Sequence, residues 1–214
     1  GHYSSAGDIA IMTAELMQKE YYRGWFLTWL DYLRGGATQI LNTNKLVRYY
    51  DGIIGGKTGT TDGAGCCLTA CAERGDMRLV AVVLGCGEDP ARFEKAEELL
   101  DYGFSSFERF TPETDSRELI SIPVERGEVT EIKPMVKQTG ECIIKKGRSG
   151  SVKYEYTFVE KLEAPVEKGQ FVGEYLVTLD GVEVYRSDIV AREDVRRMTF
   201  GMYFVHILSD MFTF

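Results

Sequence analysis

The sequence has little histidine and no long apolar run. Its two histidines, His2 and His206, stand near opposite ends of the 214 residues, and none of its five cysteines forms a C-x-x-C pair. A closed zinc site draws on paired ligand spacings, so the sequence does not predict a structural metal centre. No stretch holds 18 uninterrupted apolar residues, so no segment has the pattern of a membrane-spanning helix.

The cysteines are odd in number, which leaves at least one without a disulfide partner in the chain. They are Cys66, Cys67, Cys71, Cys86 and Cys142. The C-C-x-x-x-C cluster is the one pattern open to a metal interpretation, but it offers neither paired spacings nor a fourth ligand. We therefore expect mostly buried, reduced thiols that pack as small hydrophobic side chains.

Positive charge is also in short supply. The chain has 25 lysines and arginines against 33 aspartates and glutamates, a formal net charge of −8 at pH 7. A protein that binds duplex nucleic acid needs a basic face, so nucleic acid is not an expected partner. Hydrophobic residues make up 44% of the sequence, which is enough for packed cores and too much for a disordered chain.

The first part of the chain predicts helices. Ser5-Ala-Gly-Asp8 has the form of a capping box, and apolar residues at helical spacing follow it, which predicts a helix over about 6–20. A second helix is predicted over about 21–33, where Gly35-Gly36 ends it. The residues that follow predict a short strand or hairpin around Gln39–Arg48.

The next segment predicts an antiparallel sheet covered by helices. Strands are expected at Cys66–Ala72 and Arg78–Gly85, joined by the turn-rich Glu73-Arg-Gly-Asp76. Leu79–Leu84 is apolar on both faces, which is typical of a central strand. Asp89-Pro90 provides an N-cap and a first-turn proline for a further helix. That helix is expected to bury Phe93, Ala96, Leu99, Leu100, Tyr102 and Phe104.

The character of the sequence changes after Thr111-Pro112. Short strands punctuated by glycines follow, and Asp180-Gly181 is a strong hairpin signal. The predicted strands are Leu119–Val124, Val129–Val136, Glu141–Lys145, Val152–Phe158, Gln170–Leu179 and Val182–Arg186. The pattern predicts a small all-β sandwich over 115–191, after a first domain over 1–114.

Residues 192–214 return to a helical period. One stripe contains Val195, Met198, Met202, Val205, Leu208 and Phe212, and aromatic neighbours widen it. We expect an amphipathic helix that anchors 193–214 in a membrane interface, mainly through hydrophobic contact. The alternative is a helix docked on the β domain.

The stretch Gly56-Lys57-Thr58 does not fit a phosphate loop, because that motif needs a glycine where Asp51 stands. Lys57-Thr58-Gly59 is instead one of the three motifs of serine penicillin-recognising enzymes, beside S-x-x-K and S-x-N. On an edge strand the lysine supplies positive potential, the threonine hydroxyl can bond a carboxylate, and Gly59 lets a ligand backbone approach. Because the match is so short, the alternative is that Gly56-Lys-Thr-Gly59 forms a solvated turn with no catalytic role.

The flanking sequence resembles the D-alanyl-D-alanine carboxypeptidases among the low-molecular-mass penicillin-binding proteins. The resemblance runs in order through Tyr3-Ser-Ser-Ala6, Asn42-Thr-Asn44, Gly56–Asp62 and Leu162–Gln170, although the lead-in Ile53–Gly56 is longer than usual. It implies part of a penicillin-binding/serine β-lactamase-like α/β (α+β) core, with an antiparallel sheet flanked by helices. It also implies a second, all-β sandwich domain and a C-terminal amphipathic helix.

The resemblance assigns roles to matching residues. Lys57 would give electrostatic and proton-transfer support, and Thr58 would bind the terminal carboxylate of the substrate. The backbone N–H of Thr60 would be one oxyanion-hole donor, with Thr61 beside it. Arg92 would help to hold the D-alanine carboxylate, and an exposed arginine on the helix surface is its alternative.

Two motifs of the family are missing. Neither S-x-x-K nor S-x-N occurs in this sequence. In the family both lie before the Tyr-Ser-Ser-Ala region, and the first carries the acylated serine and its lysine base. We expect the chain to be a fragment or a cleaved product of a longer protein, and the N-terminal segment of that protein to carry the serine. A separate chain that supplies the segment, or a loss of catalysis, is the alternative.

The resemblance implies a serine-type carboxypeptidase that trims peptidoglycan pentapeptide through an acyl-enzyme and is sensitive to β-lactams. No metal or organic cofactor is implied. The expected partners are stem peptides ending in D-Ala-D-Ala, β-lactam inhibitors and a membrane surface. The expected location is extracytoplasmic, on the outer face of the cytoplasmic membrane. The alternative is a non-catalytic module there that binds peptidoglycan or a protein partner.

Overall fold

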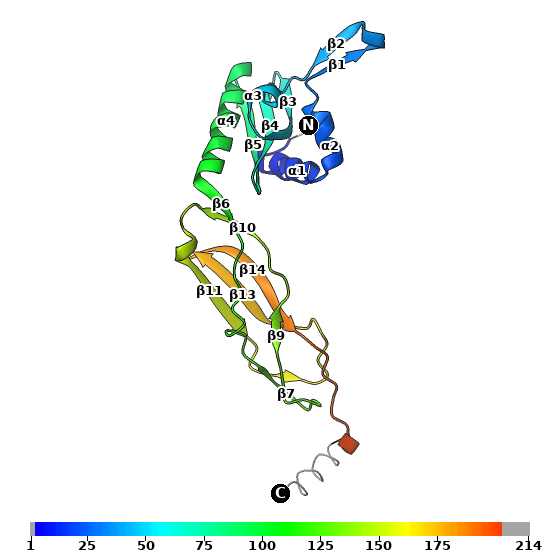
Figure 1. The fold of residues 1–214 in the computed structure, drawn as a ribbon, viewed down its shortest axis with the longest axis vertical. Coiled ribbons are helices and arrows are strands. Elements are labelled where there is room, and N and C mark those ends of the chain that lie inside the picture. Colours follow the sequence, from blue (N-terminus) through cyan, green and yellow to red (C-terminus); the bar gives the residue numbers. More distant parts are fainter. Residues whose placement is uncertain (1–2, 203–214) are drawn as a thin grey trace. The chain divides into compact units, whose positions relative to one another are not determined.

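The computed structural model describes residues 3–202. The chain divides by its internal contacts into two compact units, Gly1–Glu108 and Arg109–Phe214, each with a hydrophobic core of its own. The sequence-based boundary at 114/115 lies a few residues beyond this division. Strand β6 (Phe107–Phe110) crosses from one unit to the next (Figure 1).

Unit 1 mixes helices with two antiparallel sheets. Its elements are α1 (Ala6–Gln18), α2 (Glu20–Leu27), β1 (Leu30–Leu33), the 3-10 turn Arg34–Gly36, β2 (Thr38–Leu41), α3 (Leu46–Tyr49), β3 (Ile53–Thr61), β4 (Gly65–Arg74), β5 (Met77–Cys86) and α4 (Asp89–Ser106). Helix α1 begins as predicted, because Ser5 and Asp8 form both hydrogen bonds of the capping box.

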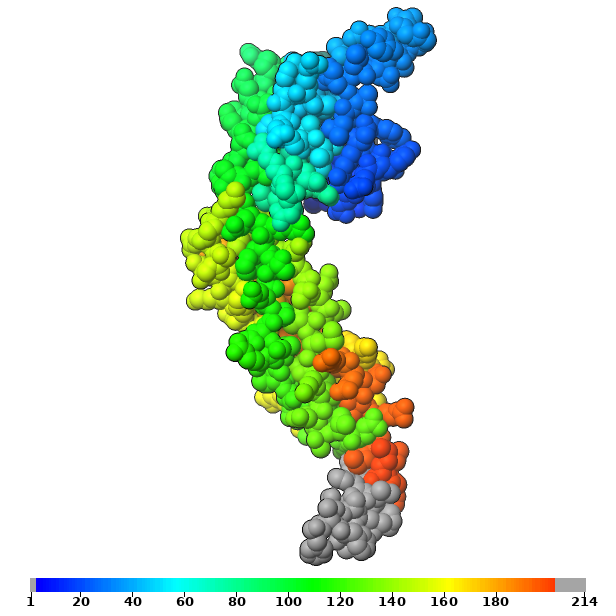
Figure 2. All heavy atoms as spheres, viewed as in Figure 1, coloured from blue at the N-terminus to red at the C-terminus, as the bar shows by residue number. Residues whose placement is uncertain are grey.

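The predicted second helix is too long. Helix α2 ends at Leu27, and Leu30–Leu33 is strand β1, which pairs antiparallel with β2 in a hairpin. The Asn42 side-chain amide explains the end of the helix, because it donates to the backbone carbonyls of Phe26 and Thr28. The glycine pair forms the hairpin turn, and the hairpin stands out from the rest of unit 1 (Figure 2).

The main sheet of unit 1 has the strand order β3-β4-β5. The β4–β5 hairpin is confirmed, but β4 is the central strand and β5 lies at the edge of the sheet among residues 3–202. Leu68 and Ala70 of β4 pack in one core with Leu100 of α4. On the opposite face the Thr69 hydroxyl lies 2.9 Å from that of Thr13 in α1. Helices therefore cover both faces, which explains the apolar pattern of the strands.

The buried face of helix α4 is narrower than predicted. Phe93, Ala96, Leu100 and Phe104 are buried, whereas Leu99 and Tyr102 are exposed by 50% and 60%. The buried residues recur every three or four positions, so only one side of the helix meets the sheet. The N-cap is Glu88, one residue earlier than predicted, and Pro90 lies in the first turn.

Unit 2 is a sandwich of two sheets over one core, as predicted. The first sheet has the order β11-β13-β14-β9 and the second β12-β7-β8. The strands are β7 (Ile122–Glu125), β8 (Glu131–Ile132), β9 (Pro134–Val136), β10 (Cys142–Lys145), β11 (Val152–Phe158), β12 (Leu162–Glu163), β13 (Phe171–Leu179) and β14 (Val182–Ala191). Asp180 and Gly181 turn the β13–β14 hairpin, both at positive φ.

The predicted terminal helix is wrong in its first residues. The backbone of residues 192–199 is not helical, and Val195 is buried in the core of unit 2, where it forms a bridge with Val166. Two backbone hydrogen bonds, at 2.8 and 2.9 Å, join these valines, so the segment lies against the sandwich as an extended chain. Residues 200–202 are helical, and the predicted helix from residue 203 onward lies outside the described residues. No helix within residues 3–202 is long and apolar enough to cross a membrane.

The expectation of mostly buried thiols is wrong as well. All five cysteines are free, but only Cys71 is fully buried, and the other four are partly exposed. Burial raises the pKa of the Cys71 thiol to about 11, so this side chain behaves as a small hydrophobic group.

Val195 provides a test of the corrected C-terminal segment. Val195→Ala is expected to destabilise the protein by about 1–2 kcal/mol, because it removes apolar contact from a packed core. Phe200→Ala is the matched control, since Phe200 is 87% exposed and its loss should leave stability unchanged. Urea unfolding, monitored by far-UV circular dichroism, measures the free energy of unfolding of both variants. Equal effects of the two substitutions would contradict the docked, extended segment.

Candidate functional site

Strand β3 carries the Lys57-Thr58-Gly59 motif at a sheet edge. The strand pairs with β4 on one side only, so its other side is open among residues 3–202. Side chains alternate along a strand, and Thr58 lies opposite Leu68, which packs toward α4. Thr58 and Thr60 therefore face α4, while Lys57 and Thr61 face the other way.

The Lys57 side chain is exposed, and its ammonium group donates to the backbone carbonyl of Thr58 at 2.5 Å. This contact folds the side chain back along its own strand. The positive charge is therefore held close to the backbone of β3, where an approaching carboxylate could meet it.

Thr58 is buried, and its hydroxyl lies 2.5 Å from that of Thr43. Sequence reasoning missed Thr43 as a partner, although it lies within the Asn42-Thr-Asn44 stretch that carried the resemblance. The side-chain oxygens of Asn42 and Asn44 accept from the backbone N–H groups of Asn44 and Leu46, and so hold this turn in place. A hydroxyl has one proton and two acceptor positions, so Thr58 can donate to a ligand while it accepts from Thr43.

Arg92 of α4 is buried beneath the end of β3. Its guanidinium donates to the carbonyls of Gly59 and Cys67, each at 3.2 Å, and to the Thr60 hydroxyl at 3.1 Å. Asp89, one turn earlier on the helix, pairs with it. The alternative of an exposed surface arginine is wrong, since Arg92 is 5% exposed. Its Nε is buried without a partner within the described residues.

Thr60 and Thr61 end the strand. Both are exposed, and the Thr61 hydroxyl accepts a hydrogen bond from the backbone N–H of Ala64, which closes the turn to β4. The structure thus brings Thr60 together with Arg92 and Gly59. It places Lys57 on the opposite side of the strand from this cluster.

Gly56, immediately before the motif, is required by the backbone. Its φ is +141°, and a Cβ atom there would lie 2.3 Å from the carbonyl oxygen of Thr69 on the neighbouring strand. Gly59 differs, because no atom beyond its own residue and its two chain neighbours lies within 4 Å of the place its Cβ would take. Gly56 therefore serves strand pairing, whereas Gly59 leaves open space beside the strand.

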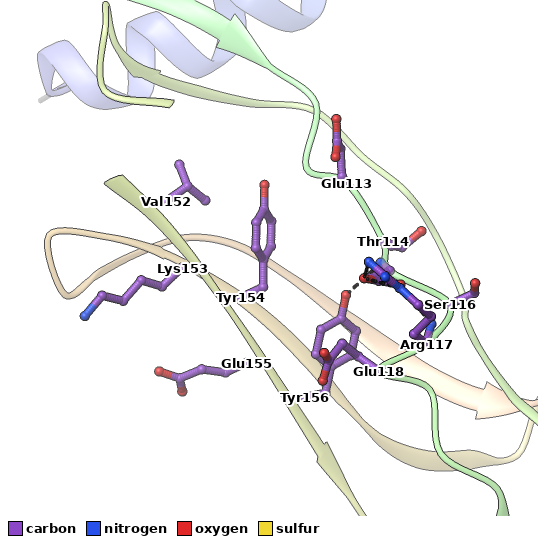
Figure 3. A pocket seen from close by; sticks show the side chains of 11 residues that line it. Glu113, Thr114, Ser116, Arg117, Glu118, Val152, Lys153, Tyr154, Glu155 and Tyr156 are labelled. Atoms are coloured by element: carbon purple, nitrogen blue, oxygen red, sulfur yellow. Dashed lines mark hydrogen bonds and ion pairs between the residues drawn. The ribbon is translucent and has the colours of Figure 1, made fainter. Parts of the chain in front are cut away.

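A separate cleft of about 870 Å³ opens in unit 2, between the edge strand β11 and residues 113–118. Figure 3 shows Tyr154 rising from β11 toward the segment that carries Glu113. The Tyr154 ring is parallel to that of the buried Tyr175, with centroids 6.3 Å apart. The Tyr156 hydroxyl accepts from the backbone N–H of Asp115 and so fixes one wall.

The cleft carries unpaired acidic groups. Within residues 3–202, no hydrogen bond or ion pair engages the side-chain carboxylates of Glu113, Glu118 or Glu155. Asp115 differs, since Arg117 holds it through several hydrogen bonds and lowers its pKa to about 2. No local pattern of residues indicates this cleft, because its walls are distant in sequence.

Arg92 offers a test of the anchored strand end. Arg92→Ala is expected to lower the free energy of unfolding by about 2–3 kcal/mol, because it removes charged hydrogen bonds to two carbonyls and a hydroxyl. Lys95→Ala on the same helix is the control, since that side chain is exposed and pairs only with its neighbour Glu98. Chemical denaturation compares the two. An Arg92 variant as stable as the wild type would contradict the anchoring role.

Comparison with known proteins adds independent information. Residues 1–88 match the sequence model of the D-alanyl-D-alanine carboxypeptidase family, and residues 107–197 match that of the penicillin-binding protein 5 C-terminal domain. D-alanyl-D-alanine carboxypeptidase DacF of Bacillus subtilis is 33% identical over 214 residues, which cover 98% of this chain and 55% of DacF. DacC of Escherichia coli is 33% identical over 201 residues, 91% of this chain and 49% of DacC.

Solved structures agree in fold. Penicillin-binding protein 5 from Haemophilus influenzae superimposes with a TM-score of 0.79 at 28% identity, over 92% of this chain and 58% of that one. Penicillin-binding protein 6B from Escherichia coli has a TM-score of 0.62 at 23% identity, over 88% of this chain and 50% of that protein's chain. This likeness supports the fold alone. The chain spans about half the length of the curated relatives it matches. It belongs to the D-alanyl-D-alanine carboxypeptidase family.

Proposed function

We propose that this chain is the strand-bearing part of a serine-type D-alanyl-D-alanine carboxypeptidase that trims peptidoglycan pentapeptide. The observation that carries the proposal is Lys57-Thr58-Gly59 on the open edge of β3, with the lysine exposed and the glycine side unobstructed. An extended peptide can lie along such an edge, and its carboxylate end would meet the positive charge of Lys57.

The residues of the β3 motif would have separate roles in binding and catalysis. Lys57 supplies positive potential and proton-transfer support, and the Thr58 hydroxyl donates to the terminal carboxylate while it accepts from Thr43. The backbone N–H of Thr60 would donate to the oxyanion of the acyl-transfer step, with Thr61 beside it. Arg92 holds the Gly59 carbonyl and the Thr60 hydroxyl, so its role here is to position the strand end.

The nucleophile must come from elsewhere, because the sequence contains neither S-x-x-K nor S-x-N. We propose that an N-terminal segment of the complete protein carries the serine that attacks the D-Ala-D-Ala bond. The serine oxygen would form an acyl-enzyme and release D-alanine, and water would then hydrolyse the ester. A β-lactam would acylate the same serine. The proposed location is extracytoplasmic, on the outer face of the cytoplasmic membrane. Membrane contact through 193–214 is proposed only for the second half of this segment, because Val195 in the first half is buried in unit 2.

Fluorescent penicillin tests this function on the complete encoded protein. Lys57→Ala is expected to slow labelling by about 10²–10³-fold, because it removes charge stabilisation at the site. Stability should not change, since the Lys57 side chain is exposed. Lys95→Ala, another exposed lysine of unit 1, should label at the wild-type rate. A wild-type protein that takes no label at saturating reagent would refute the enzymatic proposal.

The cleft of unit 2 favours a second candidate function, the binding of peptidoglycan or a protein partner without turnover. A tyrosine ring beside carboxylates that have no ion-pair partner within residues 3–202 suits the ring faces and hydroxyl groups of a sugar chain. This function requires no nucleophile and would stand if labelling fails.

Sedimentation with purified peptidoglycan tests the second candidate. Tyr154→Ala is expected to weaken binding about tenfold, because it removes the exposed aromatic surface of the cleft. Phe171→Ala is the control, since Phe171 is a half-exposed aromatic residue of the same unit outside the cleft. Failure of the wild-type chain to sediment, or equal losses in both variants, would rule the cleft out as a peptidoglycan site.

A further inference from the structure

Two of the partly exposed cysteines lie opposite each other on adjacent strands of the main sheet. Cys66 of β4 and Cys86 of β5 are direct cross-strand neighbours. Residues directly opposite in an antiparallel pair share a face and have Cα atoms about 4.5–5.5 Å apart. A disulfide needs about 4.4–6.8 Å between Cα atoms, so the usual spacing of such a register pair falls within the range that a disulfide requires.

An irregularity in β5 creates this pairing. From Cys66 to Leu68 the chain advances two residues, whereas their partners Cys86 and Val83 are three residues apart. The extra residue is a β-bulge, and Gly85 within it has a φ of +72°. Without the bulge, Gly85 rather than Cys86 would lie opposite Cys66. The register that brings the two thiols together therefore depends on a specific local feature of the fold.

The other cysteines are poorly placed to compete. Cys67 follows Cys66 on the strand and so points to the opposite face, where its thiol contacts the carbonyl of Ala64 at 3.3 Å. Cys71 is buried opposite Val80, and Cys142 belongs to unit 2. Cys66 and Cys86 are the one cross-strand cysteine pair within the described residues.

We propose that Cys66 and Cys86 form a reversible disulfide. A small-molecule disulfide, RS–SR, is the oxidant: one thiolate attacks it, releases RSH and forms a mixed disulfide, and the second thiolate displaces the remaining RSH. The two protein thiols are oxidised and one external disulfide is reduced to two thiols. Both protein thiols are partly exposed, which gives the reagent access.

The bond would fasten the sheet beside the motif strand. Cys66 lies opposite Thr60 of β3, and the two side chains are in contact, with Oγ1 and Sγ 4.0 Å apart. A disulfide here closes the β4–β5 hairpin at its open end and restrains the turn that follows Thr61. This inference concerns the fold of unit 1 and does not depend on the proposed function.

Oxidation of the 214-residue chain with glutathione disulfide tests the proposal. Two of the five thiols should become resistant to alkylation, and digestion with trypsin should yield one cross-linked peptide pair that dithiothreitol separates. Cys66→Ser and Cys86→Ser should each abolish the cross-link. Cys67→Ser is the matched control, because it removes the adjacent thiol and should leave the cross-link intact. A bond that persists in Cys66→Ser, or five alkylatable thiols after oxidation, would overturn the proposal.

A stability measurement adds a second readout. The oxidised wild type should unfold at a higher temperature than its reduced form, because the bond restrains the unfolded chain. The oxidised and reduced forms of Cys86→Ser should unfold at the same temperature. A wild type whose unfolding temperature falls on oxidation would show that the strands cannot hold the bond without distortion.

Discussion

The fold of unit 1 depends on a buried guanidinium. Arg92 reaches from α4 to the backbone of β3 and β4, and it bonds carbonyls on both strands. An unpaired buried charge is costly, so the helix and the two strands hold an arrangement in which the guanidinium bonds both strands at once. Arg92 and the shared apolar core of Leu68, Ala70 and Leu100 together position the motif strand relative to α4. Asp89, partly exposed at the start of the helix, balances its charge.

Local signals were predicted well from the sequence. The Ser5–Asp8 capping box, the β4–β5 hairpin and the Asp180-Gly181 turn each depend on residues close together in the chain, and each was confirmed. Membership of the family was also accessible, because its motifs stand in order along the chain. The roles of Lys57 and its neighbours remain predictions.

Features set by distant contacts were not predictable in the same way. The end of α2 depends on Asn42, which lies in another element, and the burial of Val195 depends on Val166. The apolar stripe of 192–214 has a helical period, yet backbone pairing with the sandwich decides the conformation of its first residues. Tertiary contacts thus override periodicity where both compete for the same residues. Likewise, the burial of Arg92 follows from packing that no local pattern encodes.

The open edge of β3 has a consequence for the behaviour of the chain in solution. A bare strand edge invites pairing with the edge of another molecule, which leads to aggregation, and charged side chains along the edge counter it. Lys57 is exposed on this strand and repels a second copy that approaches in register. The same ammonium group that would attract an anionic peptide end therefore also works against self-association of the protein.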